Sequence, residues 1–424
     1  MTDTIFAVSS GSPPAAIAVI RISGPDADRA LTVLTTQPLP APRYAALRTL
    51  RAGEQQLDTA IVIRFPGPKT ATGENVVELH LHGGRATIAV VSGTLERIPG
   101  FRPAAPGEFT RRAFANGRLD LSEAEGLSDL LAAQTEHQRR SALLMATGGL
   151  SRFVDRIRHE LLAASANVEA AIDFADEDDV VPWLERPAVL RSIASQVEVI
   201  LANPPAERLR DGIRIAIAGP PNAGKSTLIN HLGARDAAIV SAVAGTTRDI
   251  IEVPVTLRGV PVIFIDTAGL RDGTADEIEA IGIARAQAII ASSDLILWLG
   301  NPDLAPERPG VIAIRAKADL SDCPGDHRLA VSAMTGDGMA ALTDIIVTAA
   351  SALLPPPDAL ALNRRQRDCL TELSAHVHAA ALASDLLVSA EYLRLARLAL
   401  DRLTGRVGVE DMLDALFGTF CIGK

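Results

Sequence analysis

Residues 219–226 read Gly-Pro-Pro-Asn-Ala-Gly-Lys-Ser, and this loop constrains the fold more than any other part of the sequence. It follows the apolar run Ile213–Ala218, which has the length of a buried strand, and a helical pattern follows it. The glycines let backbone N–H groups curl around phosphates, and the N-terminus of the next helix adds a positive dipole. Lys225 can reach the β and γ phosphate oxygens, and Ser226 can ligate Mg²⁺. The loop predicts a nucleoside triphosphate site.

A second motif, Asp-Thr-Ala-Gly at residues 266–269, ends an apolar run that reads as another buried strand. Asp266 can hold Mg²⁺ through water, and the N–H of Gly269 can meet the γ-phosphate of a bound triphosphate. The next residue is Leu270, where small signalling GTPases carry the Gln that orients the attacking water. Hydrolysis by this chain therefore needs another group for that task.

Two further motifs indicate that the base is guanine. Ala-Lys-Ala-Asp at residues 316–319 follows the strand-like run Val311–Arg315, and Asp319 is placed to accept hydrogen bonds from guanine N1 and N2. Ser-Ala at residues 332–333 supplies the usual second contact through its backbone. Ala316 replaces the Asn of the usual Asn-Lys-x-Asp pattern, which removes about 1 kcal/mol of hydrogen bonding. We expect guanine preference to survive through Asp319, with weaker affinity.

The loop at residues 241–249, Ser-Ala-Val-Ala-Gly-Thr-Thr-Arg-Asp, supplies Thr247 as a further Mg²⁺ ligand. With the side-chain oxygen of Asn222 it offers ligands for a monovalent cation beside the phosphates, a positive charge in the place of an arginine finger. The alternative, in which Asn222 only tightens the turn, stays open. The predicted nucleotide-binding residues are Asn222, Ala223, Gly224, Lys225, Ser226, Thr227, Ser241, Ala242, Val243, Ala244, Gly245, Thr246, Asp266, Thr267, Ala268, Gly269, Lys317, Asp319, Ser332 and Ala333.

Proline breaks divide the chain into parts of different character. Pro-Pro at 204–205 closes a helical stretch, and Pro-Pro-Pro at 355–357 opens another; between them strands alternate with helices, as in a parallel α/β sheet. The 424 residues, 48% of them hydrophobic, supply apolar material for more than one core. The predicted domains are an α+β domain at 1–117, a helical part at 118–210, an inserted G domain at 211–353 and a second helical part at 354–424.

Helical periodicity flanks the α/β part on both sides. Ser122 with Glu125 three residues later is a capping-box signature, and it predicts one long helix that runs to Ala146. The C-terminal helical stretches are too short to build a core alone, so we expect them to pack against the helices that precede the α/β part. Further helices are predicted at residues 154–172, 359–403 and 409–417.

The acidic balance of the chain limits its partners and its compartment. With 41 Lys+Arg against 51 Asp+Glu the formal net charge is −10, so an RNA contact needs a local basic patch or a partner's charge. The three cysteines are odd in number and far apart, which favours a reducing compartment over a disulfide framework. No uninterrupted apolar run reaches about 18 residues. We expect a cytoplasmic protein without a membrane segment.

The nucleotide motifs, read together with Cys-Ile-Gly-Lys at residues 421–424, resemble the MnmE (TrmE) family of tRNA modification GTPases. Three segments in the N-terminal part of the chain resemble the folate-binding N-terminal domain of that family: residues 19–24, 72–84 and 106–114. The resemblance spans the whole chain. It implies a multidomain α/β and all-α fold, in which an α+β folate-binding-like N-terminal domain precedes a helical domain interrupted by an inserted P-loop G domain.

The resemblance also implies roles for single residues. Glu279 positions the attacking water, and Arg118 stands where Lys is usual, which keeps the charge but changes its geometry. On spacing alone, an inert cysteine is the more common interpretation of Cys421. By resemblance, the catalytic residues are Glu279, Cys421 and Lys225; the Mg²⁺ ligands are Ser226 and Thr247; the K⁺ ligands are Asn222, Ser241, Val243 and Thr246; and the folate-binding residues are Arg21, Glu78, Arg118 and Lys424.

The function that the resemblance implies is K⁺-dependent GTP hydrolysis coupled to tRNA modification. A (carboxymethyl)aminomethyl group is added to C5 of the wobble uridine, with a one-carbon unit from 5,10-methylenetetrahydrofolate or 5-formyltetrahydrofolate. The implied partners are a second copy of the chain joined through the N-terminal domains, tRNA, and a flavoprotein of the MnmG (GidA) family. That flavoprotein supplies FAD and NADH chemistry within a heterotetramer.

Two other functions stay open from the sequence. A regulatory GTPase switch acting on ribosome or RNA assembly would carry similar G-domain motifs. That function does not explain the N-terminal segments that resemble a folate-binding domain, or the C-terminal Cys-Ile-Gly-Lys at 421–424. A folate enzyme that the phosphate loop merely regulates is the second alternative. His80 and His82 and the acidic run at 173–179 lack the spacing of a complete metal site. The basic pair at 111–112 is expected to be solvated surface.

Overall fold

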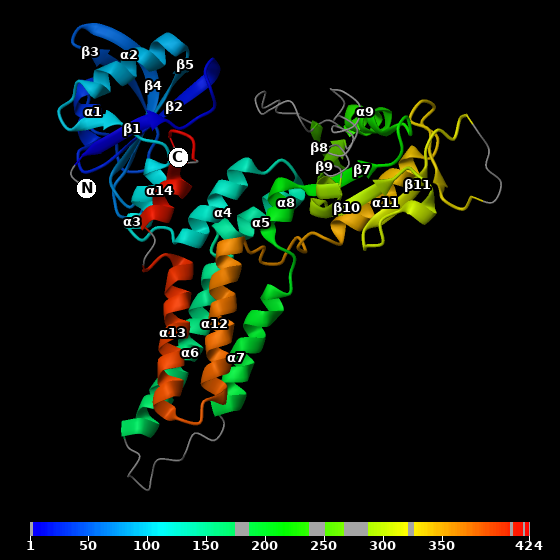
Figure 1. The fold of residues 1–424 in the computed structure, drawn as a ribbon. Coiled ribbons are helices and arrows are strands. Elements are labelled where there is room, and N and C mark those ends of the chain that lie inside the picture. Colours follow the sequence, from blue (N-terminus) through cyan, green and yellow to red (C-terminus); the bar gives the residue numbers. More distant parts are fainter. Residues whose placement is uncertain are drawn as a thin grey trace, which may run out of the picture. The chain divides into compact units, whose positions relative to one another are not determined.

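The computed structural model describes residues 3–173, 186–236, 251–266, 287–320, 326–407, 410–418 and 420–423. Contacts between residues divide the chain into two units, each with its own sheet (Figure 1). Unit 1 comprises Met1–Ser128, Ala146–Arg158 and Arg397–Lys424, and unit 2 comprises Asp129–Met145 and His159–Ala396. Both units therefore combine segments that are far apart in the sequence.

Unit 1 holds a six-stranded sheet with the order β3-β4-β5-β2-β1-β6. β1 and β6 are parallel, and every other pair of neighbours in this sheet is antiparallel. Helices α1 and α2 cover one face of the sheet (Figure 1). The elements are β1 (Thr4–Val8), β2 (Ala15–Ser23), α1 (Ala27–Leu34), β3 (Ala46–Ala52), β4 (Gln55–Phe65), β5 (Val76–Gly83), α2 (Arg85–Glu96), β6 (Phe101–Pro103), α3 (Glu108–Ala115), α4 (Leu121–Ala132) and α14 (Glu410–Gly418).

Alternation of residues along the strands fixes the two faces of this sheet. Val77, Leu79 and Leu81 of β5 are buried in the core beneath α1 and α2, together with Ile20 and Ile22 of β2. Side chains on a strand alternate between faces, so the residues between these positions lie on the opposite face. That open face carries two of the predicted folate residues.

The C-terminal segment is part of unit 1. α14 packs against α3, and Phe417 and Phe420 form an aromatic cluster with Phe114 of α3. Beyond it, Ser9 Oγ donates a hydrogen bond to the carbonyl oxygen of Gly423 at 2.8 Å. Residues 420–423 therefore lie beside the end of β1, more than four hundred residues away in sequence.

The start of α4 corrects the prediction of a cap at Ser122. The backbone N–H of Glu123 donates to Asp120 Oδ1 at 2.9 Å, and that of Asp120 donates to Glu123 Oε2 at 2.8 Å. This pair forms the capping box, because its spacing is the same and it precedes the first helical residue. Ser122 lies buried inside the helix, where its hydroxyl donates to the carbonyl of Leu403.

The single helix predicted to run to Ala146 is also wrong, because α4 ends at Ala132 and α5 begins at Glu136. A second capping box starts α5. The N–H of Gln138 donates to Thr135 Oγ1 at 3.2 Å, and the N–H of Thr135 donates to Gln138 Oε1 at 2.9 Å. Thr-x-x-Gln is a recognisable capping sequence that the periodicity of the surrounding residues conceals.

Unit 2 contains a second six-stranded sheet, with the order β12-β11-β10-β7-β9-β8. β8 and β9 are antiparallel, and the other pairs of neighbours are parallel. The elements of this sheet and its helices are α8 (Ala206–Asp211), β7 (Ile213–Ala218), α9 (Lys225–Asp236), β8 (Ile251–Leu257), β9 (Val260–Asp266), β10 (Leu295–Trp298), the 3₁₀ turn η1 (Pro302–Leu304), β11 (Val311–Arg315), β12 (Leu329–Ala330) and α11 (Met339–Ser351).

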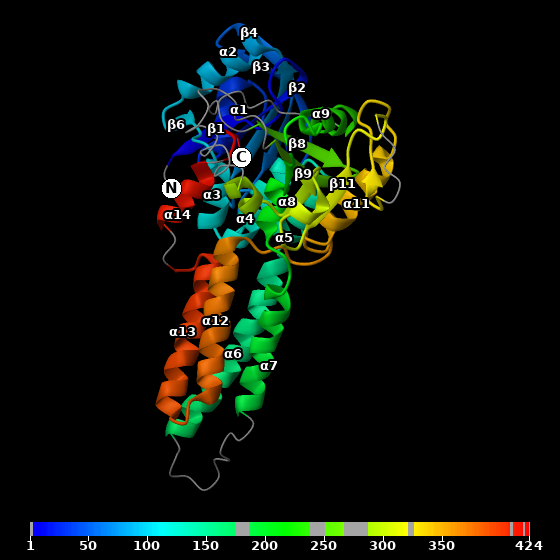
Figure 2. The ribbon, with the colours of Figure 1, turned by 45° about the vertical axis from the view of Figure 1, so that its right-hand side comes forward.

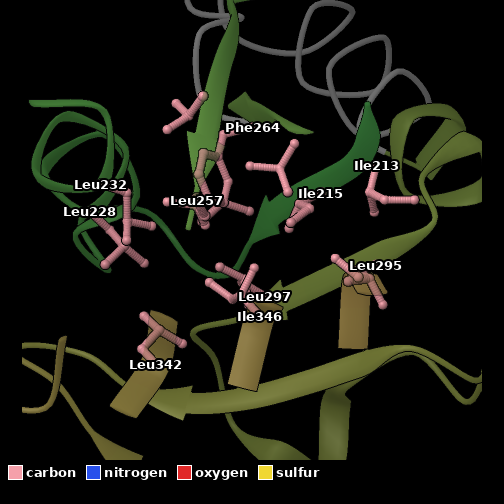
Figure 3. Close-up of a cluster of buried hydrophobic side chains, with 14 of the residues drawn as sticks. Ile213, Ile215, Leu228, Leu232, Leu257, Phe264, Leu295, Leu297, Leu342 and Ile346 are labelled. Atoms are coloured by element: carbon pink, nitrogen blue, oxygen red, sulfur yellow. The ribbon is translucent and has the colours of Figure 1, made fainter. Parts of the chain in front are cut away.

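Figure 3 shows the larger core of this sheet, a cluster that includes Leu228 and Leu232 of α9, Leu342 and Ile346 of α11, and Ile215 of β7. Unlike the strands of unit 1, β7 and β9 are buried on both faces and read as continuous apolar runs. This burial explains why the predicted bounds of β7 agree with the structure. The predicted bounds of β11 agree as well, although only Ile314 of that strand is fully buried.

The remaining helices of unit 2 are α5 (Glu136–Ala146), α6 (Gly149–Asp173), α7 (Arg186–Leu201), α12 (Arg364–Leu382) and α13 (Leu386–Thr404). Of these, α5, α6 and α13 have residues in both units, as α4 does. The four long helices α6, α7, α12 and α13 form a bundle (Figure 1). α7 and α12 lie side by side along their length (Figure 1 and Figure 2). The C-terminal helical stretch thus packs against a helix that precedes the G domain, as the sequence predicts. Among the described helices, none is both long and apolar enough to cross a membrane.

Candidate functional site

The phosphate loop joins β7, an inner strand, to α9 at the carboxyl end of the sheet. Lys225, only 7% exposed, lies across this loop, and its Nζ donates to the carbonyl oxygens of Gly219 and Pro220 at 2.9 Å each. Asn222 and Gly224 adopt left-handed backbone conformations, with φ of 62° and 95°. These turns curl the backbone into the concave shape that an anion requires.

Ser226 and Asp266 meet beside the phosphate loop. The hydroxyl of Ser226 donates to Asp266 Oδ2 at 2.7 Å. Asp266 ends β9, which runs parallel to β7, so the sheet itself brings this buried carboxylate to the loop. A hydroxyl and a carboxylate oxygen are the hard ligands that Mg²⁺ prefers, so the pair fits the predicted ion.

The predicted guanine motif lies next to the phosphate loop. Lys317 has a φ of 57°, and a Cβ atom placed on Gly224 would be 3.7 Å from its Cε atom, so the stem of the lysine passes over the loop. Asp319 is exposed. The backbone N–H of Ala318 donates to Val331 O at 3.1 Å. This bond connects the motif to the loop of Ser332 and Ala333, the second base loop.

Ala316, the departure from the usual guanine motif, packs its methyl group against the hydrophobic core of the sheet. Ala333 packs against the same core, while Ser332 is fully buried. Ser332 Oγ accepts a hydrogen bond from Thr335 N at 3.2 Å, so this hydroxyl shapes its own loop. The two base loops therefore share one apolar support.

Part of the predicted nucleotide site lies outside the described residues. Asn222 is the predicted K⁺ ligand that the structure does describe, and its side chain is exposed. The roles given to the other residues stay predictions. Outside the described ranges are Ser241, Ala242, Val243, Ala244, Gly245, Thr246, Thr247, Thr267, Ala268, Gly269, Glu279 and Lys424.

On the open face of the unit 1 sheet, Arg21 of β2 and Glu78 of β5 stand directly opposite each other in the strand register. Nε and Nη2 of Arg21 both donate to Glu78 Oε1, at 3.1 and 3.0 Å. The Arg21 guanidinium also lies 5.9 Å from the ring centroid of Phe109 on α3. Both side chains keep some exposure, 26% and 18%, so the pair can accept a polar ligand.

Arg118 lies over the loop at residues 70–73. Its Nε donates to Thr70 O at 3.1 Å, and its stem contacts Gly73. Asn116 Nδ2 donates to Thr72 O at 2.7 Å, so two side chains from the end of α3 hold the same loop. Within the described ranges, no hydrogen bond joins Arg118 to the pair on the sheet.

A buried charge cluster supports this region, and it corrects the expectation of a solvated basic pair at 111–112. Arg112 is 0% exposed, whereas its neighbour Arg111 is exposed. Arg112 Nη2 donates to Asp3 Oδ1 at 2.9 Å and to Glu108 Oε1 at 3.1 Å, and its Nη1 lies 3.2 Å from Glu74 Oε2. The Glu108-x-x-x-Arg112 spacing is the signal that sequence reasoning could have used.

These pairings also set the protonation of the carboxylates. Burial acts to raise the pKa of Glu108, but hydrogen bonds from Arg102, from the N–H of Ala105 and from Arg112 outweigh it and hold that pKa below its usual value. The pKa of Asp3 is lowered against its burial by the hydrogen bond from Arg102 and the charge of Arg112. Both carboxylates therefore stay charged at neutral pH.

Cys421 is an exposed free thiol in the C-terminal tail, residues 420–423, which lies beside the end of β1. The close approach of Gly423 anchors this tail, because a Cβ atom there would be 2.1 Å from the carbonyl oxygen of Val8. The histidines of β5 have other partners: His82 Nδ1 lies 2.7 Å from Asp58 Oδ1. No group of three or more His, Cys, Asp or Glu in the described ranges is arranged to hold a metal.

Comparison with known proteins agrees with this architecture. A model of the GTP-binding protein TrmE N-terminus matches residues 4–118, and a model of the MnmE helical domain matches residues 121–421. Proteins named tRNA modification GTPase MnmE are similar over the whole of this chain: 53% identical in Rhizorhabdus wittichii, with 97% of that protein covered, and 54% in Novosphingobium aromaticivorans and 52% in Erythrobacter litoralis, each fully covered. The predicted fold class is confirmed, and the chain belongs to the MnmE family of tRNA modification GTPases.

Proposed function

We propose that this chain is a K⁺-dependent GTPase that acts with an FAD-dependent partner to add a (carboxymethyl)aminomethyl group to C5 of the wobble uridine in certain tRNAs. The observation that carries the nucleotide part is the meeting of Ser226 and Asp266 beside a loop that Lys225 crosses. Family membership supports the tRNA part, because the relatives are named for that modification.

In the proposed hydrolysis, Lys225 turns from the loop carbonyls to the β and γ oxygens of GTP, and the curled backbone donates N–H groups to the same phosphates. Ser226 and Thr247 would hold Mg²⁺, with Asp266 as a further ligand through water, and the ion would neutralise phosphate charge. Asp319 accepts two hydrogen bonds from guanine. Leu270 cannot orient water, so Glu279 takes that role.

Asn222 is the described part of the proposed K⁺ site, and it belongs to the phosphate loop with a left-handed backbone and an exposed side chain. A bound K⁺ supplies positive charge beside the transferring phosphoryl group. Replacing K⁺ by Na⁺ should slow GTP turnover, and equal rates in the two salts would remove the cation from the proposal. Glu279→Ala should slow turnover strongly while leaving GTP binding nearly unchanged.

We place a tetrahydrofolate at the Arg21–Glu78 pair, with Arg118 and Lys424 completing the site. When bound, this group supplies the one-carbon unit. Glu78 can accept from the amino and N–H groups of a pterin, and the two arginines can meet carbonyl or carboxylate groups. Glu78→Gln should weaken binding of 5-formyltetrahydrofolate, measured by calorimetry, whereas Glu54→Gln in the β3–β4 turn serves as a control and should not.

The open face of the unit 1 sheet supports the proposed homodimer. This face exposes three large apolar side chains: Leu47 is 65% exposed, Ile61 43% and Ile17 58%. Exposed apolar side chains gathered on one face commonly mark an interface. Leu47→Lys with Ile61→Lys should shift the mass measured by light scattering from dimer to monomer. A mass that stays unchanged in the double variant would place the dimer contact elsewhere.

Substitution of Cys421 separates modification chemistry from GTP hydrolysis. Cells whose only copy carries Cys421→Ser should lose the C5-substituted wobble uridines, as measured by mass spectrometry of tRNA nucleosides, while the purified variant still hydrolyses GTP. An unchanged nucleoside profile would make Cys421 dispensable. If Lys225→Ala were equally silent, the profile would favour a GTPase switch that acts on RNA assembly without modification chemistry.

A further inference from the structure

His231 links the helix that follows the phosphate loop to the second base loop. It lies on α9, as Lys225 does, and its Nδ1 is 2.8 Å from the carbonyl oxygen of Ala333. A carbonyl oxygen only accepts, so Nδ1 carries the proton and donates. The other ring nitrogen, Nε2, is buried and has no hydrogen-bond partner among the described residues. The imidazole therefore presents its donor to Ala333.

Ala333 is the residue whose backbone is predicted to contact guanine, so the position of its peptide group matters for base recognition. Its loop is closed by local hydrogen bonds, which include those from Ser332 N to Asp337 O and from Gly336 N to Ser332 O at 2.9 Å each, and from Thr335 N to Ser332 Oγ at 3.2 Å. Those bonds shape the loop but do not connect it to the phosphate loop. The hydrogen bond from His231 makes that connection through α9.

The second observation is the alanine at position 316. The usual motif carries Asn there, whose amide can donate and accept, and alanine can do neither. Ala316 instead packs against the core cluster that contains Leu228 and Leu232 of α9. Ala333 packs on the same cluster. Ala316 therefore offers this part of the site no side-chain hydrogen bond, whereas His231 offers one.

We propose that His231 is a positioning residue of the base site, which anchors the Ser332-Ala333 loop to α9 by a side-chain hydrogen bond of a kind that Ala316 cannot make. This inference rests on the proposed GTPase function and adds a specificity-determining residue to it. His231 does not touch the nucleotide. It acts through Ala333, by limiting the positions that the second guanine contact can adopt.

The position of the bond predicts a selective effect. When the Ala333 peptide moves freely, binding of a guanine nucleotide must first order it, and that ordering weakens the affinity. His231→Phe keeps a ring of similar size but removes the donor. We expect it to weaken GDP binding by about fivefold, the effect of one lost hydrogen bond, mainly through faster dissociation. His231→Gln, which keeps a donor, should stay within about twofold of the parent protein.

The decisive measurement is a rescue. Ala316→Asn restores the amide of the usual motif, so it should recover most of the lost affinity in the His231→Phe background and change little in the parent protein. Stopped-flow dissociation of a fluorescent GDP from the full chain, with GDP and ADP as competitors, measures all four proteins of this double-mutant cycle. Asn230→Ala, at the exposed neighbouring position of α9, is the matched control.

Equal GDP dissociation from the His231→Phe variant and the parent would overturn the inference. So would an Ala316→Asn effect of the same size in both backgrounds, because independent sites give additive effects. A purely structural histidine would lower the unfolding temperature of the variant without a rescue by Ala316→Asn. If the parent protein showed no preference for GDP over ADP, the proposed guanine site itself would fail, whatever the histidine does.

Discussion

The two sites of this chain are built from different parts of the polypeptide. The phosphate-binding part of the unit 2 site is one short contiguous loop, whose backbone curls at Asn222 and Gly224. The sheet site of unit 1 is mostly charged side chains: Arg21 and Glu78 meet across strands, and Arg112 is buried among Asp3, Glu74 and Glu108. A contiguous loop can be recognised in the sequence. A site whose side chains come from segments far apart in the sequence can be recognised only in the folded structure.

The two sites also differ in how much the stability of the folded protein depends on them. A curled loop satisfies its polar groups locally and can change shape when a ligand binds. A buried guanidinium must keep all its partners, because an uncompensated buried charge is strongly destabilising. Mutations should therefore damage unit 1 through stability and unit 2 through activity.

The largest effect should follow from Arg112→Met. The substitution leaves the carboxylates of Asp3, Glu74 and Glu108 without their shared cation, so we expect the free energy of unfolding to fall by about 3–5 kcal/mol. Denaturant unfolding, with hydrogen exchange in β1 and α3 as a local probe, measures it. Arg111→Met, on the same helix with an exposed partner, should cost about 1 kcal/mol or less. Equal losses would remove the contrast between the two sites.

Lys225→Ala should act in the opposite way. It removes a charge that stabilises the transferring phosphates, so we expect kcat/KM for GTP to fall by about 10²- to 10³-fold. The hydrogen-exchange pattern of unit 1 should not change. Steady-state hydrolysis together with the unfolding midpoint gives both quantities, and a large loss of stability in this variant would contradict the division between stability and activity.

Acid should weaken the sheet site. Glu108 and Asp3 have pKa values below their ordinary 4.5 and 3.8 in the folded protein, so their stabilisation is complete above those values. It is lost as the pH falls through them toward the folded pKa, because protonation then favours the unfolded chain. Hydrogen exchange in β1 and α3 should accelerate in that range. Glu108→Gln should reduce this dependence on pH, and an unchanged profile would show that the pairing carries no linkage.

The smallest effect should come from the cap of α4. Asp120→Ala removes the side chain that accepts from Glu123 N, and we expect a loss of about 1 kcal/mol. Ser122→Ala, at the position where the sequence first suggests a cap, should not expose that N–H group. Thermal unfolding of the two variants compares them, and a greater loss with Ser122→Ala from helix fraying would restore the sequence-based assignment.

Prediction succeeded where a single local signal fixed the structure. β7 is a buried parallel strand, so its apolar run has clear ends. It failed at α4, where two overlapping pairs have the spacing of a capping box and the contact of Ser122 with Leu403 helps decide between them. It failed again at Arg112, because one charged residue on a helix looks like another until its partners are known.

The sequence by itself determined the phosphate loop, the order of the nucleotide motifs and the family, because each depends on residues that are contiguous or follow a fixed order. Tertiary structure alone decided which residues meet across distance: Ser9 with Gly423, Arg112 with Asp3, and His231 with Ala333. Such contacts depend on how strands pair and helices pack. Burial then gives a charged or polar side chain a meaning that its neighbours in the sequence do not contain.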